Sequence, residues 1–485
     1  MYALTLLFFC ILWATTIHIE RLSLPDFRVM QSPYSWFLIS WVPGAVLLAL
    51  PIYRFAETFT LADAMYVGAL HASFVGGNLL AVLARKQAVS PDRKMRSAIF
   101  SEPVIAVFLL IGLVGQVLIA VDAQRSGTLS FSDRFSLTSI SDIKKQYTDL
   151  TQSSSFGSFA AVMRYMVAFG QVAIIAYSCA AANRVDWARR RPLFLLVVLL
   201  IFVSIVNSWI STGGRLGIIV TALFCALPWT LQSAWRDSFR RGGIQVWQLI
   251  RRYLLPGIIA AVAVVFLSTA FLQNRIGENA PLDQMYLAHR AQLDRDLLIV
   301  VQDMPSLQTG LLQASYLTSG LPTLSYYLHL NDYLPGPDYG LVNFQIFYLT
   351  FGRLFPGYDN QAGATAYNDL LSPLSDRGYF ANVWGTMARE VLIDFGRHGT
   401  LVFFLVFGFL SSRLRIAYYF SPTLEVGVLY TLFRMQMIFS GFHSLISHRL
   451  FGYAFVVALA IWLVARMARS PRQMGVTLLP SRPAR

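Results

Sequence analysis

A chain of 485 residues is long enough for two or three soluble domains, but its composition excludes that organisation. Hydrophobic residues make up 56% of the chain and charged residues only 13%. The apolar residues come in repeated blocks of roughly 18–24, each long enough to cross about 30 Å of hydrocarbon. The formal net charge of +14 comes from arginines in short loops between these blocks, and no basic stripe of a nucleic-acid-binding domain is visible. The sequence therefore predicts an all-α, polytopic membrane protein that does not bind nucleic acid.

About eleven membrane spans are predicted from the apolar blocks. In chain order they cover residues 2–19, 34–53, 61–84, 103–123, 158–182, 192–211, 215–232, 253–273, 398–416, 424–441 and 450–467. Arginine- and lysine-rich stretches follow the third, fifth, seventh and eleventh spans, at 85–96, 184–191, 236–252 and 466–472. All four stretches fall on one side, which the positive-inside rule identifies as cytoplasmic. We therefore expect the amino terminus outside and the carboxyl terminus inside.

Four regions follow from this pattern. Residues 1–273 hold the first eight spans, residues 274–397 form a large outer loop, residues 398–467 hold the last three spans, and residues 468–485 are a basic cytoplasmic tail. A shorter, polar outer loop lies at 124–157. Loops as long as the large one are usually functional, so we expect the chemistry of this protein to lie close to it.

Short apolar helices are predicted inside the large loop. Residues 281–304 place apolar residues among charged ones at helical spacing, which predicts one amphipathic helix. Residues 311–330 and 341–355 are apolar but short and interrupted, so we expect re-entrant or interfacial helices there. Their Tyr and Phe residues suit the headgroup level of a membrane, and the same rings are surfaces on which sugars stack.

Three arginines lie inside the predicted spans, in the half nearer the outer face: Arg164, Arg215 and Arg434. Charges within spans are costly, and they usually face a cavity or a partner. A guanidinium group donates two parallel hydrogen bonds to a phosphate, so this set suggests a site for a lipid diphosphate. The alternative for each arginine is snorkelling to the surface or hydrogen bonding to carbonyl groups of a neighbouring helix.

The segment that leads from the large loop back into the membrane carries a concentrated set of charges. A helix here places Glu390 and Asp394 one turn apart beside Arg389 and Arg397, and glycines, the first of them Gly396, break it before the next span. A carboxylate beside arginines can act as a base on a sugar hydroxyl. The alternative is a structural set of ion pairs that holds the loop down.

Metal and nucleotide chemistry are not predicted. His443 and His448 are five residues apart, which is a poor spacing for one helical face, and neither has a HExxH-type neighbour. No Walker motif or GxGxxG pattern is present in a fitting context. We therefore expect no metal and no cofactor.

Three features resemble a known family, the O-antigen and exopolysaccharide repeat-unit polymerases (Wzy type). Asn382-Val383-Trp384-Gly385, followed by Asp394-Phe395-Gly396 and Gly399, is similar to the late segment of that family. Ser211-Thr212-Gly213-Gly214-Arg215 is similar to its opening of an earlier span, and Arg275 is similar to its arginine soon after the span that precedes the large loop. The predicted topology resembles the family over essentially the whole chain, whereas the motifs cover only a small part of it.

The resemblance implies a membrane glycosyltransferase with a GT-C-like fold. It would transfer the growing glycan from undecaprenyl diphosphate to an incoming lipid-linked repeat unit, at the periplasmic face of the bacterial inner membrane. Its expected partners are undecaprenyl-diphosphate-linked oligosaccharides, membrane lipids, a chain-length regulator and a flippase. The site residues implied are Arg164, Arg215, Arg275, Arg290 and Arg434 for the diphosphate, Arg389, Glu390, Asp394 and Asp294 for catalysis, and Tyr379 and Asn382 for the glycan.

Two other functions stay open. An O-antigen ligase would share this architecture, but ligases usually carry a His-Asn pair where this chain has Ala381-Asn382. The missing histidine favours a polymerase and also removes the obvious base. A transporter of lipid-linked oligosaccharides would be expected to show inverted repeats and short outer loops, neither of which this chain has.

Overall fold

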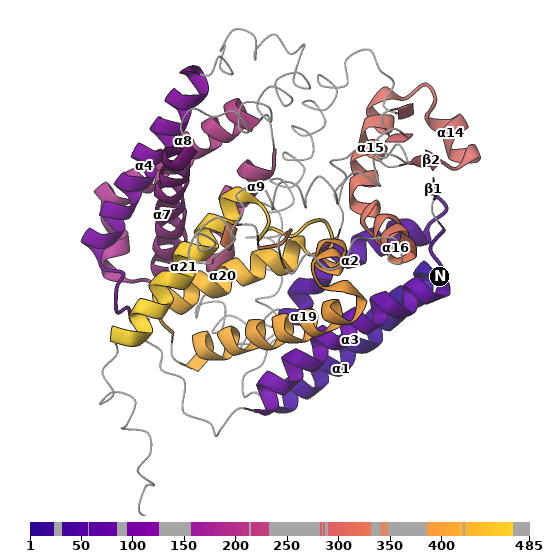
Figure 1. Ribbon diagram of the computed structural model, residues 1–485, viewed down its shortest axis with the longest axis horizontal. Coiled ribbons are helices and arrows are strands. Elements are labelled where there is room, and N and C mark those ends of the chain that lie inside the picture. Colours follow the sequence, from indigo (N-terminus) through magenta and orange to yellow (C-terminus); the bar gives the residue numbers. More distant parts are fainter. Residues whose placement is uncertain are drawn as a thin grey trace, which may run out of the picture.

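The structure is a computed structural model that is almost wholly helical (Figure 1). It describes residues 1–23, 32–56, 58–84, 95–125, 157–212, 215–231, 282–283, 285–286, 290–330, 340, 342–344, 346–347, 386–420 and 422–468. The elements in the first half are α1 (Tyr2–Ser23), α2 (Pro33–Ala49), β1 (Tyr53–Phe55), α3 (Leu61–Leu83), α4 (Glu102–Arg125), α7 (Gly157–Ala182), η2 (Asp186–Arg189), α8 (Arg191–Thr212), α9 (Arg215–Ala226) and η3 (Leu227–Leu231). Those in the second half are β2 (Ala291–Leu293), α14 (Arg295–Val301), α15 (Pro305–Thr318), α16 (Gly320–Leu330), α19 (Met387–Phe420), α20 (Leu424–Phe439) and α21 (Arg449–Ala468).

Seven of the described helices are long and apolar enough to cross a membrane: α1, α3, α4, α7, α8, α19 and α21. Two shorter apolar helices, at Pro33–Ala49 and Gly217–Trp229, accompany them. The predicted all-α, polytopic class is therefore confirmed. The predicted span at 253–273 lies outside the described residues, as does most of the polar loop at 124–157, so the number of eleven spans stays a prediction.

The spans α3 and α19 pack along each other in the same direction, with α1 beside α3 (Figure 1). Glycines allow the close approach. A Cβ atom added to Gly77 would overlap with the carbonyl oxygen of Leu405, and one added to Gly408 would overlap with the carbonyl oxygen of Phe74. Small residues at a membrane helix interface let the two backbones touch, so these glycines determine where α19 sits.

The helix α19 consists of two segments joined at Gly396. This glycine has φ 67° and ψ −178°, a backbone conformation that side chains with a Cβ atom rarely adopt. The predicted break at Gly396 is confirmed, and it separates residues 387–395 from the span that begins at Arg397. Because the direction of the chain changes there, Arg397 does not continue the helical face of Glu390 and Asp394.

The predicted single amphipathic helix over residues 281–304 is wrong. The strand β2 pairs antiparallel with β1 in this stretch, with Tyr53 opposite Leu293, and the short helix α14 follows. Arg290, with φ 50°, breaks any helix just before the strand, because this conformation is unfavourable for a residue with a side chain. Pairing with a strand far away in the sequence then outweighs the local helical pattern.

The described part of the large loop holds α15 and α16, which are two short helices separated at Ser319, in agreement with the predicted interrupted pattern. The helix α16 packs on the beginnings of two spans. Ser325 donates to the Asp63 carboxylate of α3 at 2.8 Å, and the Arg397 guanidinium of α19 donates to the carbonyl oxygen of Leu328. We call this end of the bundle, where α3 and the span of α19 begin, the site end.

The opposite end of the bundle gathers loops from three parts of the chain. The Glu425 carboxylate at the start of α20 accepts hydrogen bonds from the main-chain nitrogens of Ala98 and Ile99, at 2.9 and 3.0 Å. Arg190 pairs with Glu102 at 2.7 Å. The loops that precede α4, follow α7 and precede α20 therefore lie at one end, as the predicted topology requires of loops on one side.

Candidate functional site

The first segment of α19 places a buried carboxylate against a histidine from another part of the chain. The main-chain nitrogen of Met387 donates to the carbonyl oxygen of Ser440 at 2.8 Å, which joins the start of α19 to the turn between α20 and α21. Glu390, one turn further on, is 1% exposed, and its Oε1 lies 2.7 Å from Nδ1 of His443. The hydroxyl group of Ser447 donates to Oε2 at 3.0 Å.

The imidazole Nδ1 of His443 lies at ion-pair distance from the buried carboxylate of Glu390, and we call this pair the oriented base. A carboxylate that accepts from Nδ1–H fixes the imidazole tautomer and leaves Nε2 as the basic nitrogen. The His443 side chain is 20% exposed whereas that of Glu390 is buried, so the imidazole is the member of the pair that a substrate can reach. Such a histidine can take a proton from a hydroxyl group.

His443 is the residue that sequence reasoning missed. Its spacing from His448 excluded a metal pair, and nothing local indicates that it faces a carboxylate more than fifty residues earlier. One signal could have found it. A histidine in the short turn between the last two predicted spans lies at the same membrane face as the segment that carries Glu390.

A buried arginine lies next to this pair. Arg389 is 3% exposed, and its guanidinium carbon lies 5.6 Å from the ring centroid of Tyr327 on α16. Its main-chain nitrogen donates to the Thr386 hydroxyl group at 3.2 Å, which caps the first turn of α19. The structure thus places Arg389 beside Glu390, as predicted, and gives the site a fixed positive charge.

Asp394 makes hydrogen bonds with both carboxylate oxygens. Oδ1 accepts from the main-chain nitrogen of Val342 at 2.9 Å, and Oδ2 accepts from the main-chain nitrogen and from Nδ2 of Asn343, both at 2.8 Å. This carboxylate, expected at the catalytic centre, anchors a buried piece of the large loop against α19. The partners of Asp394 are amides, and those of Glu390 are His443 and Ser447, with the charge of Arg389 also acting on Glu390.

Contacts with neighbouring helices fix the turn that carries His443. Gln436 donates to Sδ of Met387 and accepts from the main-chain nitrogen of Ile446 at 3.0 Å. The indole nitrogen of Trp41 donates to the hydroxyl group of Ser440 at 2.9 Å. Because these contacts come from α2, α19 and α20, the position of His443 is set by three elements, which is the support a catalytic group requires.

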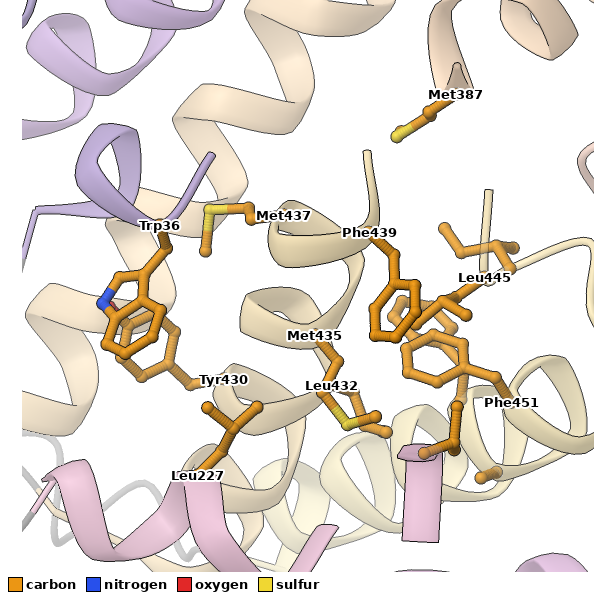
Figure 2. Packing of buried hydrophobic residues seen from close by; sticks show 14 of the residues in the cluster. Trp36, Leu227, Met387, Tyr430, Leu432, Met435, Met437, Phe439, Leu445 and Phe451 are labelled. Carbon is orange, nitrogen blue, oxygen red and sulfur yellow. The ribbon is translucent and has the colours of Figure 1, made fainter. Parts of the chain in front are cut away.

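Arg434, predicted as a diphosphate ligand, lies elsewhere. Its guanidinium carbon is 3.8 Å from the ring of Trp36, and Nη1 donates to the carbonyl oxygen of Leu227 at 3.2 Å. Figure 2 shows Trp36 and Leu227 on one side of α20 and Met387 on the other. Leu227 directly follows α9, so Arg434 supplies a donor and a positive charge to a helix end inside the bundle. For Arg434, the structure therefore agrees with hydrogen bonding to a carbonyl group of a neighbouring helix, which was the alternative to a diphosphate site.

The other two arginines predicted within spans lie near the beginnings of their helices. Arg164 is half-buried near the start of α7, and the neighbouring Tyr165 packs edge-on against Tyr453 of α21, with ring centroids 4.8 Å apart. Arg164 is therefore next in sequence to a contact between α7 and α21. Arg215 opens α9, as its motif predicted.

Arg290 and Asp294 belong to a separate part of the large loop. Figure 1 shows β1, β2, α14 and α15 together at one edge of the molecule, away from α4, α7 and α8. Arg290 stacks on Tyr286 at 5.0 Å, and Asp294 caps α14 and pairs with Arg54 at 2.6 Å. These contacts stabilise the strand pair and give no link to Glu390.

Three predicted site residues, Arg275, Tyr379 and Asn382, lie outside the described residues. Among the residues that the structure does describe, no three His, Cys, Asp or Glu side chains come together as metal ligands would. Comparison of the chain with family models, with curated proteins and with solved structures finds no match. The geometry of the site and the chemistry of its residues therefore carry the functional argument.

Proposed function

We propose that this protein is a membrane glycosyltransferase that polymerises oligosaccharide repeat units carried on undecaprenyl diphosphate. The observation that carries the proposal is the oriented base Glu390–His443, with Arg389 beside it, at the point where the large loop enters the bundle. The polymerase-like segment of the sequence ends on this same helix. The sequence left a polymerase without an obvious base, and His443 supplies one.

The proposed reaction uses the pair as follows. A hydroxyl group of the acceptor sugar gives its proton to Nε2 of His443, and its oxygen attacks the anomeric carbon of the growing glycan. The bond from that carbon to the diphosphate oxygen breaks, and the diphosphate leaves with the electron pair. Glu390 offsets the positive charge that His443 gains, while Arg389 and Arg164 offset the negative charge of the departing diphosphate.

The predicted orientation puts this chemistry at the periplasmic face of the bacterial inner membrane. The loops at the opposite end flank the arginine-rich stretches, which favour the cytoplasmic side. The site end is then periplasmic, together with the amino terminus of α1 and the turn that carries His443. Lipid-linked repeat units presented at that face would meet the exposed side of the imidazole.

An O-antigen ligase is the second candidate, since it would use the same donor and the same type of base. Reconstitution separates the two. Purified protein in liposomes is given lipid-linked repeat units with and without lipid A, and chain growth is scored against transfer to lipid A. Growth without lipid A supports a polymerase, whereas transfer to lipid A without growth supports a ligase.

Deletion of the gene in its host gives a second test. A polymerase-deficient strain should carry surface glycan of single repeat units, because units are still made and exported but not joined. A ladder of normal polymer length in the deletion strain would refute the proposal. A complemented strain carrying His443→Ala should resemble the deletion, and one carrying His329→Ala, which alters another histidine at the site end, should resemble the wild type.

A further inference from the structure

The side chain of Asn343 offers a hydrogen-bond acceptor in a fixed direction. Its Nδ2 atom and its main-chain nitrogen both donate to Oδ2 of Asp394 at 2.8 Å. A carboxylate can only accept, so the amide nitrogen must face Asp394. The carbonyl oxygen Oδ1 is therefore turned away from Asp394 and cannot exchange places with the nitrogen.

This oxygen has no donor among the residues that the structure describes. Asn343 is 1% exposed, and within the part of the chain that the structure describes Oδ1 has no hydrogen-bond partner. The hydroxyl group of Ser444 is also buried and, in the same described part, without a partner. Buried polar groups are nearly always satisfied, and a polar ligand or a water molecule would satisfy both of these atoms.

Asn343 is bound to the helix that carries Glu390, and Ser444 belongs to the turn that carries His443. Asp394, which holds Asn343, lies one helical turn after Glu390, and positions i and i+4 share a helix face. Ser444 follows His443 directly, and its carbonyl oxygen accepts from Ser447, the residue that also contacts Glu390. One unsatisfied atom therefore lies in the turn that carries His443, and the other in the loop segment bound one helical turn after Glu390.

We propose that Asn343 and Ser444 form a subsite for a neutral, hydroxyl-bearing ligand, and that Asp394 is the positioning residue that sets the direction of the Asn343 carbonyl. The amide oxygen accepts from one hydroxyl group, and the Ser444 hydroxyl donates to or accepts from another. Glu390 and Asp394 disfavour an anion here. This inference rests on the proposed function, and in that reaction the ligand is the acceptor sugar, with its reacting hydroxyl group at His443.

The test uses the full-length protein in nanodiscs of phosphatidylethanolamine and phosphatidylglycerol. Two probes are compared: lipid-linked oligosaccharide extracted from the deletion strain, and the same oligosaccharide released from its lipid by mild acid. Asn343→Leu removes the acceptor at similar volume and leaves both main-chain bonds to Asp394 in place. We expect it to weaken binding of both probes about tenfold, and to raise the KM for the repeat unit with little change in kcat.

Ser444→Ala removes an atom that has no hydrogen-bond partner among the described residues. Ser444→Ala should weaken binding of both probes without lowering the midpoint of thermal unfolding. If Asn343→Leu unfolds the protein, the affinity of Ser444→Ala tests the subsite alone.

The outcomes separate the subsite from the polymerase. Binding of the released oligosaccharide that depends on Asn343, without chain growth, supports the subsite and refutes the polymerase. Normal chain growth and wild-type affinity in both Asn343→Leu and Ser444→Ala support the polymerase and overturn the subsite. Failure of the wild type to bind either probe overturns the subsite as well.

Discussion

Among the described residues, two histidine–carboxylate contacts at the site end differ in distance and in the exposure of the histidine. His443 and Glu390 are 2.7 Å apart, with the histidine 20% exposed. His329 and Asp63 are 3.5 Å apart, with the histidine 48% exposed. Both carboxylates are buried, and both contacts join the last part of a loop or turn to a helix of the bundle.

The difference lies in what else each carboxylate does. Asp63 caps α3, accepting from the main-chain nitrogen and hydroxyl group of Thr60, and it also accepts from Ser325. Its role is structural, and His329 adds a long, solvent-screened contact. In Glu390, Oε1 lies 2.7 Å from Nδ1 of His443, and Oε2 accepts a hydrogen bond from Ser447. The Glu390–His443 contact is short, whereas the Asp63–His329 contact is long and Asp63 is already occupied by Thr60 and Ser325. We call the Asp63–His329 contact the structural pair.

The strongest test of this contrast is alanine substitution of the two histidines. His443→Ala should lower kcat for chain growth about 10²–10⁴-fold, the usual contribution of general acid–base catalysis, whereas His329→Ala should leave kcat unchanged. Turnover of lipid-linked repeat units in proteoliposomes measures both. Equal losses in the two variants would remove the distinction and with it the assigned base.

A smaller effect is expected from Glu390→Gln. The amide can still accept from Nδ1–H of His443 but carries no charge to balance the imidazolium that forms. Hydrogen bonds to charged groups contribute roughly 1.5–3 kcal/mol, so kcat should fall about 10- to 150-fold. Thermal unfolding should show that the variant folds. A kcat equal to that of His443→Ala would mean that the carboxylate itself takes the proton.

Substitution of Asp63, the carboxylate of the structural pair, should lower the stability of the protein and leave its turnover unchanged. Asp63→Ala removes the N3 carboxylate of the capping box and the partner of Ser325, and helix capping contributes about 0.5–2 kcal/mol. The midpoint of thermal unfolding in detergent should fall, while kcat measured well below that midpoint stays at the wild-type value. Thr60→Ala offers a comparison, since it removes the hydroxyl group of the same capping box and leaves the carboxylate.

The smallest effect concerns a carboxylate outside the spans. The Arg54 guanidinium and the main-chain nitrogen of Asp296 hold the pKa of Asp294 below its usual range. Because the folded-state pKa is lowered, this contribution to stability is present above the ordinary carboxyl range and is lost as the pH falls through the folded-state pKa. The unfolding midpoints of wild type and Asp294→Asn should differ slightly at neutral pH and converge in acid. High salt should shrink the difference, since Arg54 is exposed.

Much of the fold could be predicted from composition and a few special residues. A bilayer accepts only apolar helices of sufficient length, so the spans follow from hydropathy, and a glycine between a charged helix and an apolar run marks the kink at Gly396. Strand β2 could not be predicted in this way, because its partner β1 lies more than two hundred residues earlier and the local pattern is helical.

The candidate site, like the fold, could be predicted from the sequence only in part. The placement of Arg389, Glu390 and Asp394 on one short helix at the membrane entry could be predicted, because helical periodicity is a local property. Their contacts depend on how the chain packs. The bond from Met387 to Ser440 brings the turn after α20 to this helix, so Glu390 receives His443 while Asp394 receives the amides of the large loop. Such partners come from packing between distant segments, which no local pattern encodes.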